Sequence, residues 1–314
     1  MCKFDPQVIF DMSDQTRTVH FETISKLHQA IGIAKPRHPL FSIIRFEDFP
    51  EFNNEQRVRL ISDFYQITLK KECPCKVQYG QTVFDFDEGI ISCFAPKQIN
   101  IIDKDFIPAT SGWQLSIHPD FLRTHPLGQR ISKFGFFDYQ INEALILSDD
   151  EQISIEGIFE QIEKEYRLPI DQFSQDVIIA HLDVVLSYCN RYYNRQFITR
   201  GTNHSELLDK IEHLLKNWFE KQHTKGLPTA GYLAAELNLS TKYLSDCLKQ
   251  LTGLTTQQLI HDKLIEHAKG ILTTTELSVG EIAYLLGFEY SQSFSKLFKK
   301  KTDQTPMEYR ISFN

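Results

Sequence analysis

Several features that would place a protein outside the cytoplasm are missing from this sequence of 314 residues. It contains no run of about 18 or more apolar residues, the length that a membrane-spanning helix needs. Its first residues lack the basic stretch followed by an apolar stretch of a secretory signal peptide. Its six cysteines are scattered without the spacing of a disulfide framework, which fits a reducing compartment. We therefore expect a cytoplasmic protein that has no membrane partner.

Residues that could hold a catalytic metal are few and separated. Cys73-Pro-Cys75 has no second Cys or His pair at zinc spacing, so we interpret it as a structural loop. A cupin-type metalloenzyme would need clustered His and carboxylate ligands on paired strands. No His-x-His occurs, and the histidines of the N-terminal part stand alone: His20, His28, His38, His118 and His125. We expect no enzyme, no catalytic residue, no metal and no cofactor, and keep the metalloenzyme as a disfavoured alternative.

The charge is unevenly distributed along the chain. The formal net charge is −7, with 34 Lys and Arg against 41 Asp and Glu. Residues 205–314 hold 13 basic and 13 acidic residues and are neutral, so residues 1–204 hold 21 against 28 and carry the whole excess. Nucleic-acid-binding domains are typically basic. Only the lysines at 296 and 299–301 form a basic cluster, so electrostatics alone does not predict DNA binding.

Residues 40–118 consist of short alternating segments typical of strands, separated by turn residues. Expected strands cover 40–46, 64–70, 75–79, 83–87, 99–103 and 113–117. Such spacing without intervening helices favours an antiparallel sandwich or barrel, and we predict a cupin-like antiparallel β-barrel over residues 1–147. Tyr65, Tyr79 and Trp113 are candidates for lining an effector site in it. The alternative for each of these aromatics is an ordinary position in the core.

After residue 117 the pattern becomes helical. Ser148 with Glu151 forms a capping box that starts one amphipathic helix, and Pro169 ends it. A second helix is expected over about 171–195. Two such helices must bury their apolar faces against the barrel or a partner chain, so we assign residues 148–195 to dimerisation, residues 196–204 to a linker and residues 205–314 to a separate domain.

The most specific pattern lies at Ser278 to Arg310. Ser278 and Glu281 form a capping box for a first helix, whose residues Val279, Ile282, Ala283 and Leu286 lie on one face. Gly287 permits a sharp turn because a residue without Cβ takes positive φ at little cost. A second helix then buries Phe294, Leu297 and Phe298. The pattern predicts a helix-turn-helix whose outer face is polar.

This motif is repeated upstream. Ala230, Leu233, Ala234 and Leu237 match the first helix at an offset of 49 residues, and Leu244, Ser245, Leu248 and Lys249 match the second at an offset of 50. Thr255 with Gln258 and Thr305 with Glu308 repeat a capping box, the second with Pro306 at the first helical position. The helix between the units, 255–273, has a length of about 28 Å at 1.5 Å per residue. This approaches the ~34 Å between successive major-groove faces of DNA, so two recognition helices could enter adjacent grooves. The alternative is that both motifs serve only packing.

Three segments carry a resemblance to a known family: Gly287-Phe288, Phe294-Ser295-Lys296-x-Phe298-Lys299-Lys300 and Thr305-Pro306-x-Glu308-Tyr309-Arg310. They resemble the signature of AraC/XylS-type transcription regulators, and the upstream LAAELNLSTKYLSDCLKQLTG resembles the family's first unit. The resemblance covers about 100 C-terminal residues and implies two helix-turn-helix motifs in an all-α domain, hence an α+β protein of two domains. It implies DNA contacts by Lys242, Ser245, Asp246, Ser291, Gln292, Ser293 and Lys296. The helical wheel independently exposes Lys242, Tyr243, Asp246, Lys249, Gln292, Ser293, Lys296 and Lys299.

Chemistry suggests roles for these residues. Gln292 can pair with adenine, lysines with guanine or phosphate, and serines with either. Asp246 departs from the family, where Arg is common, and would repel phosphate. Asp303 stands where Gly is common. Expected partners are double-stranded DNA of promoters or operators, a second copy of the chain, RNA polymerase and a small-molecule effector. An alternative keeps DNA binding and makes the barrel only a dimerisation or protein-contact module.

Overall fold

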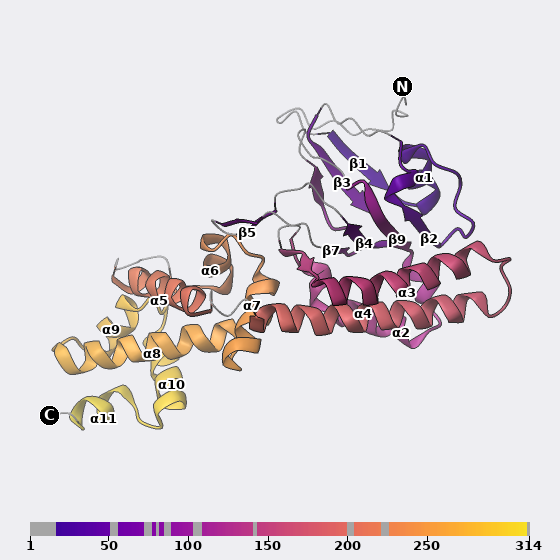
Figure 1. The fold of residues 1–314 in the computed structure, drawn as a ribbon. Coiled ribbons are helices and arrows are strands. Elements are labelled where there is room, and N and C mark those ends of the chain that lie inside the picture. Colours follow the sequence, from indigo (N-terminus) through magenta and orange to yellow (C-terminus); the bar gives the residue numbers. More distant parts are fainter. Residues whose placement is uncertain are drawn as a thin grey trace. The chain divides into compact units, whose positions relative to one another are not determined.

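The computed structural model describes residues 17–50, 56–71, 77–79, 82–84, 89–102, 109–140, 143–199, 204–220 and 226–312. The chain divides into two compact units, Met1–Gln196 and Phe197–Asn314, which we call the N-terminal unit and the C-terminal unit (Figure 1). The first contains the sheets and the second is helical. None of the helices in these ranges is long and apolar enough to cross a bilayer.

The N-terminal unit is built around a five-stranded antiparallel sheet. Its order is β10 (Leu145–Ile146), β7 (Ile90–Phe94), β4 (Tyr65–Lys71), β9 (Ser111–Ile117) and β2 (Phe41–Arg45). A second sheet has the order β1 (Arg17–Phe21), β3 (Val58–Ser62) and β8 (Asn100–Ile102), with β1 and β3 parallel. β5 (Val77–Tyr79) and β6 (Thr82–Phe84) form a hairpin. Among the described residues these sheets are separate and open at their edges, so the predicted closed cupin-like barrel is not confirmed.

One face of the five-stranded sheet is covered by helices. α3 (Asp149–Arg167) and α4 (Ser174–Thr199) lie along one side of the sheet, and α1 (Ile24–Ile31) lies on the other with β1 and β3 (Figure 1). The helix-covered face contains a set of alternate strand residues that are at most 5% exposed: Phe41, Ile43, Ile67, Leu69, Ile91, Leu115 and Ile117. Ile155, Phe159 and Ile162 of α3 are fully buried. These residues form the main hydrophobic core of the N-terminal unit, whose burial favours folding.

Short helices connect β9 to the long helices. They are η2 (Pro119–Leu122), α2 (Pro126–Arg130), η3 (Ile131–Lys133) and η4 (Gly135–Asp138), while η1 (Phe46–Asp48) follows β2. Phe121, Phe136 and Phe137 of this region are buried. Ser148 and Glu151 form the predicted capping box of α3. α4 continues to Thr199 and α5 begins at His204, so both helices extend into the residues 196–204 that were predicted as a linker.

The C-terminal unit contains seven helices in the described ranges. They are α5 (His204–Glu220), α6 (Ala230–Glu236), α7 (Thr241–Thr252), α8 (Thr256–Thr274), α9 (Val279–Leu285), α10 (Ser291–Thr302) and α11 (Pro306–Ile311). α8 supplies the centre of the core through Leu264, Ile265, Ala268 and Leu272, each at most 4% exposed. The other helices pack around it, so α8 fixes the separation of the two flanking motifs.

Candidate nucleic-acid interface

The two predicted helix-turn-helix motifs are both present. α6 and α7 form the first, and α9 and α10 form the second. Leu233 and Ala234 in the first motif, and Ile282 and Ala283 in the second, are at most 2% exposed and belong to one core cluster. The capping boxes predicted at Ser278, Thr255 and Thr305 are all formed. The repeat read from the sequence is therefore a structural repeat.

The turn of the second motif depends on Gly287. Its φ is +91°, and a Cβ added there would lie 2.4 Å from the carbonyl oxygen of Gly226. Phe288 is 7% exposed and packs against Phe294 with ring centroids 5.5 Å apart. Backbone freedom and close packing thus both require glycine at this position. The sharp turn that the sequence predicts at Gly287 is therefore present in the structure.

The first recognition helix, α7, presents a mixed polar surface. Lys242 and Lys249 are exposed, and Ser245 and Asp246 are half-buried. The Lys242 ammonium lies 2.9 Å from the Asp246 carboxylate, and the two residues of this ion pair are one helical turn apart. Such a pair at i, i+4 holds both side chains along the helix surface. Lys242 must leave or share this carboxylate to donate to DNA.

Tyr243 does not belong to this surface. Its side chain is 1% exposed, and its ring meets that of Phe197 edge-on at 5.2 Å. The helical wheel predicted that Tyr243 is exposed because a wheel assumes that α7 buries only one apolar face. Tyr243 and Cys247, one turn apart, form a second buried face at 1% and 5% exposure. The prediction that Tyr243 is exposed is wrong, and we remove it from the candidate interface.

The second recognition helix, α10, presents an open polar surface. Gln292, Ser293, Lys296 and Lys299 are exposed and Ser291 is half-buried, while Phe294 and Phe298 on the opposite side are fully buried. In the described part of the chain no hydrogen bond or ion pair engages the side chains of Gln292, Ser293 or Lys296. These groups can therefore turn toward a ligand without losing a protein contact.

Two further residues hold α10 and α11 against α8, and the sequence reading did not single them out as structural. The Arg310 guanidinium donates to the carbonyl oxygens of Leu272, at 3.0 Å, and Leu277, at 2.6 Å. Lys301 lies 2.5 Å from Asp262 of α8. Arg310 satisfies carbonyls near the end of α8, which a cation at a helix C-terminus does favourably. Lys301, one of the basic residues of the 296–301 cluster, is thus engaged in an ion pair within the C-terminal unit.

The aromatics predicted to line an effector site lie elsewhere than expected. Trp113 is 3% exposed, its indole N–H donates to Glu163 of α3 at 2.9 Å, and its ring contacts Phe159. Tyr65 is on the same face of the sheet and its ring meets that of Phe137 at 5.0 Å. α3 and η4 lie against this face, so the rings of both residues pack against helices there. The side chain of Tyr79 lies outside the described residues.

Glu163 anchors a network over Trp113. Arg45 donates through Nε to both its carboxylate oxygens, at 3.0 and 2.9 Å, and Arg167 also pairs with it. Burial opposes the charged carboxylate, but the hydrogen bonds from Arg45 and Trp113 outweigh it and lower the pKa of Glu163. This partly buried carboxylate accepts several hydrogen bonds and so connects α3 to the sheet.

Three of the N-terminal histidines, His20, His28 and His118, have hydrogen-bond partners within the unit. His28 is 3% exposed and its ring nitrogens contact the carbonyl oxygen of Ala34 at 2.6 Å and the Ser42 hydroxyl at 3.0 Å. His20 lies 2.9 Å from Asp63, and His118 accepts from the Asp120 N–H. Within the ranges that the structure describes, no group of three or more His, Cys, Asp or Glu side chains is placed to hold a metal ion. Cys73 and Cys75 lie outside those ranges.

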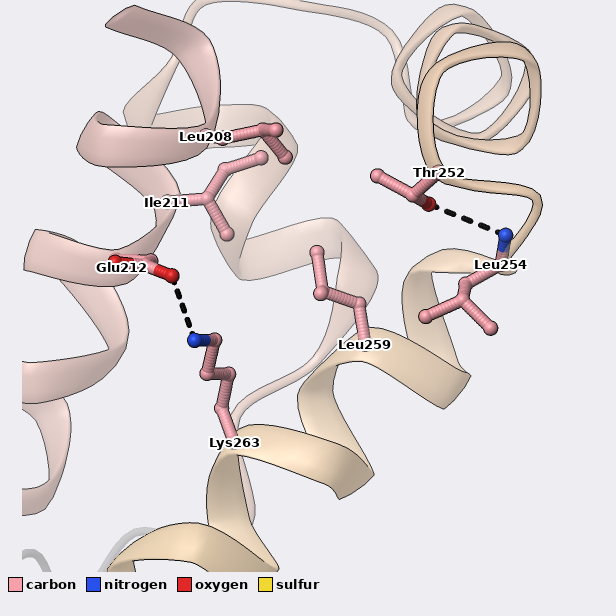
Figure 2. Close-up of a pocket in the computed structure, with 7 residues that line it drawn as sticks. All are labelled: Leu208, Ile211, Glu212, Thr252, Leu254, Leu259 and Lys263. Atoms are coloured by element: carbon pink, nitrogen blue, oxygen red, sulfur yellow. Dashed lines mark hydrogen bonds and ion pairs between the residues drawn. The ribbon is translucent and has the colours of Figure 1, made fainter. Parts of the chain in front are cut away.

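A cavity of about 250 Å³ lies in the C-terminal unit between α5, the end of α7 and α8. Figure 2 shows Leu208 and Ile211 of α5 facing Leu259 of α8 across it, with Leu254 beside them. The Glu212 carboxylate and the Lys263 ammonium pair at 2.6 Å along one side. No candidate DNA-contacting residue lines it, so it is separate from the interface.

Comparison with known proteins places this domain. Residues 233–312 match the family model of a helix-turn-helix domain. The chain is 32% identical over 111 residues to the xylose operon regulatory protein of Escherichia coli (strain K12), covering 35% of this chain and 28% of that protein. It is 30% identical over 151 residues to the HTH-type transcriptional activator RhaS of Escherichia coli O1:K1 / APEC, covering 48% of this chain and 50% of that protein. It thus spans half or less of the length of these curated relatives.

Among solved structures, the C-terminal domain of the two-component response regulator yesN from Fusobacterium nucleatum subsp. nucleatum ATCC 25586 is 38% identical. That match covers 32% of this chain and 97% of that chain, with a TM-score of 0.28. The C-terminal unit carries a helix-turn-helix domain of the AraC/XylS type. The resemblance predicted from the sequence is confirmed for this domain.

Proposed function

We propose that the protein is a transcription regulator that binds double-stranded DNA of promoters or operators through α7 and α10. The observation that carries this proposal is the pair of helix-turn-helix motifs, each with a buried apolar side and a polar outer side. Its relatives are named as a regulatory protein and a transcriptional activator, which supports the same function. α7 and α10 are the helices that would enter the DNA.

The separation of the motifs supports binding to successive major grooves. α8 has 19 residues, hence a length of about 28 Å at 1.5 Å per residue. Neighbouring major-groove faces on one side of B-DNA are ~34 Å apart. Because α8 is the centre of the domain core, it holds the two recognition helices at a fixed distance. The proposed operator therefore contains two half-sites about one helical turn apart.

The exposed side chains suggest a division of labour. Gln292 can form two hydrogen bonds to an adenine, and Lys296 and Lys242 can donate to guanine. Lys249 and Lys299 are positioned for phosphate, while Ser245, Ser291 and Ser293 can contact base or phosphate. Asp246 can accept from a cytosine amine but repels phosphate. We assign more of the affinity to α10 than to α7.

For the N-terminal unit we propose binding of a small-molecule effector that changes the population of chains competent to bind DNA. A role as a dimerisation or protein-contact module is the second candidate, and one observation favours it. Phe173 directly precedes α4, and Val177 and Val184 lie along it; these side chains are 61%, 38% and 44% exposed. An exposed apolar strip of this kind suits a second copy of the chain or RNA polymerase.

Selection of DNA from a random duplex library by the full chain tests the proposal. We expect enrichment of one sequence class whose affinity falls steeply with salt, because lysines release counterions from phosphate. Replacing the exposed Lys210 of α5 by Ala is the matched control and should leave the selected sequence and affinity unchanged. If selection yields no sequence preference at any salt concentration, the protein is not the regulator we propose.

A further inference from the structure

The cavity of the C-terminal unit lies between facing stripes of two helices (Figure 2). Leu208, Ile211 and Glu212 are spaced i, i+3 and i+4 on α5, and Leu259 and Lys263 are spaced i, i+4 on α8. Residues at these spacings are neighbours on one side of a helix, so each helix contributes one stripe to the wall. The volume of about 250 Å³ is many times what one water molecule needs.

The wall of the cavity is mainly apolar. Ile211 is 1% exposed and belongs to the hydrophobic core of the unit, and Leu208 and Leu259 pack against that core. Leu254, in the connection between α7 and α8, is half-buried and completes the apolar lining. Apolar cavities of about 150 Å³ in proteins stay dry and bind benzene. The larger cavity of this protein therefore has the size and the lining for a ring compound larger than benzene.

Most polar groups of the wall are already satisfied by the protein. The Thr252 hydroxyl accepts from the N–H of Leu254 at 3.1 Å and donates to a backbone carbonyl oxygen of α7 at 2.8 Å. The Lys263 ammonium lies 2.6 Å from one carboxylate oxygen of Glu212 and 3.4 Å from Glu266. The second carboxylate oxygen of Glu212 accepts no hydrogen bond from the described residues. This oxygen is the polar group that a ligand can use.

The charges beside the cavity favour a neutral ligand. Glu212 and Glu266 place two negative charges around the single positive charge of Lys263. The hydrogen bond to Glu212 raises the pKa of the Lys263 ammonium, which stays protonated at neutral pH. An anion would lose its hydration beside an excess of negative charge. An O–H or N–H group can instead donate to the available oxygen of Glu212, and hydrogen bonds to a carboxylate are strong.

We propose that this cavity binds a small neutral ring compound that carries one hydrogen-bond donor. Its ring lies among Leu208, Leu254 and Leu259, and its donor bonds to Glu212. The proposal goes beyond DNA binding and is independent of it, because no candidate DNA-contacting residue lines the cavity. The occupant packs against the chain between α7 and α8, so it stabilises the folded domain next to the end of the first recognition helix.

Isothermal titration calorimetry of the full chain with indole tests the proposal, because indole is neutral, larger than benzene and has a single N–H. N-methylindole has the same ring without the donor, and indole-2-carboxylate adds a negative charge. We expect saturable binding of indole and no binding of the carboxylate at the same concentrations. N-methylindole should bind about fivefold more weakly, although it is more apolar, because it cannot donate to Glu212. No saturable indole binding, or equal affinity for either of the other compounds, would overturn the proposal.

A substitution that fills the cavity locates the site. Leu254→Phe places an aromatic ring of the protein in the space proposed for the ligand and should weaken indole binding by about tenfold or more. Leu214→Phe is the matched control, because Leu214 is also half-buried and packs against the same core from α5 without lining the cavity. It should bind indole as the wild type does. Wild-type affinity in Leu254→Phe would contradict this placement.

A second variant tests the donor contact without enlarging a buried side chain. The Glu212 side chain is 55% exposed, so Glu212→Gln should fold as the wild type does. It should weaken indole binding by about threefold or more, because a neutral carboxamide oxygen is a weaker acceptor than a carboxylate. Glu266→Gln removes the neighbouring charge without touching the cavity and should leave indole affinity unchanged. Equal indole affinity in the two Gln variants would show that Glu212 does not hold the donor.

Discussion

The two helix-turn-helix motifs both have positive φ in the turn and at the end of the recognition helix, but opposite choices of residue at these places. In the turn, the first motif has Asn238 at φ +54° and the second has Gly287 at φ +91°. At the end of the recognition helix the first has Gly253 at φ +73° and the second has Asp303 at φ +61°. The left-handed conformation is required at both places, and Asn, Asp and Gly are the residues that adopt it most readily.

The space around each position explains part of this difference in residue type. A Cβ at Gly287 would meet the Gly226 backbone at 2.4 Å, whereas a Cβ at Gly253 would meet nothing within 4 Å. Only the first of these glycines is therefore required by packing. A departure from a family pattern, such as Asp303, does not signal a different fold where the backbone tolerates the side chain.

The outer surfaces of the motifs differ more than their backbones do. On α7, Lys242 is paired with Asp246, while on α10 the side chain of Lys296 has no partner in the described residues. The Ser240 side chain caps the start of α7, but Tyr290 gives α10 no side-chain cap. The open N–H groups and the unpaired lysine both favour anionic ligands at α10. The comparison predicts an unequal division of DNA affinity.

The largest effect should come from Gly287→Ala. Left-handed φ and the contact with Gly226 together should lower the free energy of unfolding by about 2–3 kcal/mol. Gly253→Ala, which meets no neighbour, should cost only about 1 kcal/mol. Denaturant unfolding of both variants measures the difference. Equal losses would show that the two positions are constrained alike, against the packing argument.

Lys296→Ala should weaken specific DNA binding by about 1–3 kcal/mol if the lysine reads a base. Lys242→Ala should cost less, because the Lys242 ammonium must leave Asp246 or share its donors with that carboxylate. Affinities for the selected DNA, with Lys210→Ala as control, rank the two motifs. A larger loss at Lys242 would reverse the proposed division.

Asp246→Asn should have the smallest effect and the opposite sign. Removing one negative charge near phosphate and releasing Lys242 should strengthen DNA binding by about 0.5–1 kcal/mol at low salt. Glu276→Gln removes an exposed charge between α8 and α9 and should leave affinity unchanged. If the Asn variant binds more weakly and loses preference at one base pair, Asp246 reads a cytosine instead.

The sequence predicted the C-terminal unit well because its signals are local. Capping boxes, apolar spacing and Gly287 all lie within a few residues of the structure that they determine, and a repeat doubles the signal. Tyr243 was misplaced because helical periodicity cannot show a second buried face. Arg310 acts through carbonyls more than 30 residues away, a contact that spacing does not reveal.

The N-terminal unit was harder because its pairing is long-range. The strands predicted at 40–46, 64–70 and 113–117 correspond to β2, β4 and β9, but alternation did not predict β1, β3, β7 or the two-residue β10. The face to which Trp113 points depends on which side α3 covers, and that is decided by pairing across the sheet. Alternation showed that the strands have two faces but not which of the two the helices α3 and α4 cover.

Footprinting of the selected DNA by the full chain tests most directly whether the two motifs read successive grooves. We predict two protected patches on one side of the duplex, about 10 base pairs apart, and a loss of affinity of at least about tenfold when five base pairs are inserted between them. Such an insertion moves the second half-site to the opposite side of the helix. A single protected patch, or affinity that does not change with the insertion, would contradict the account.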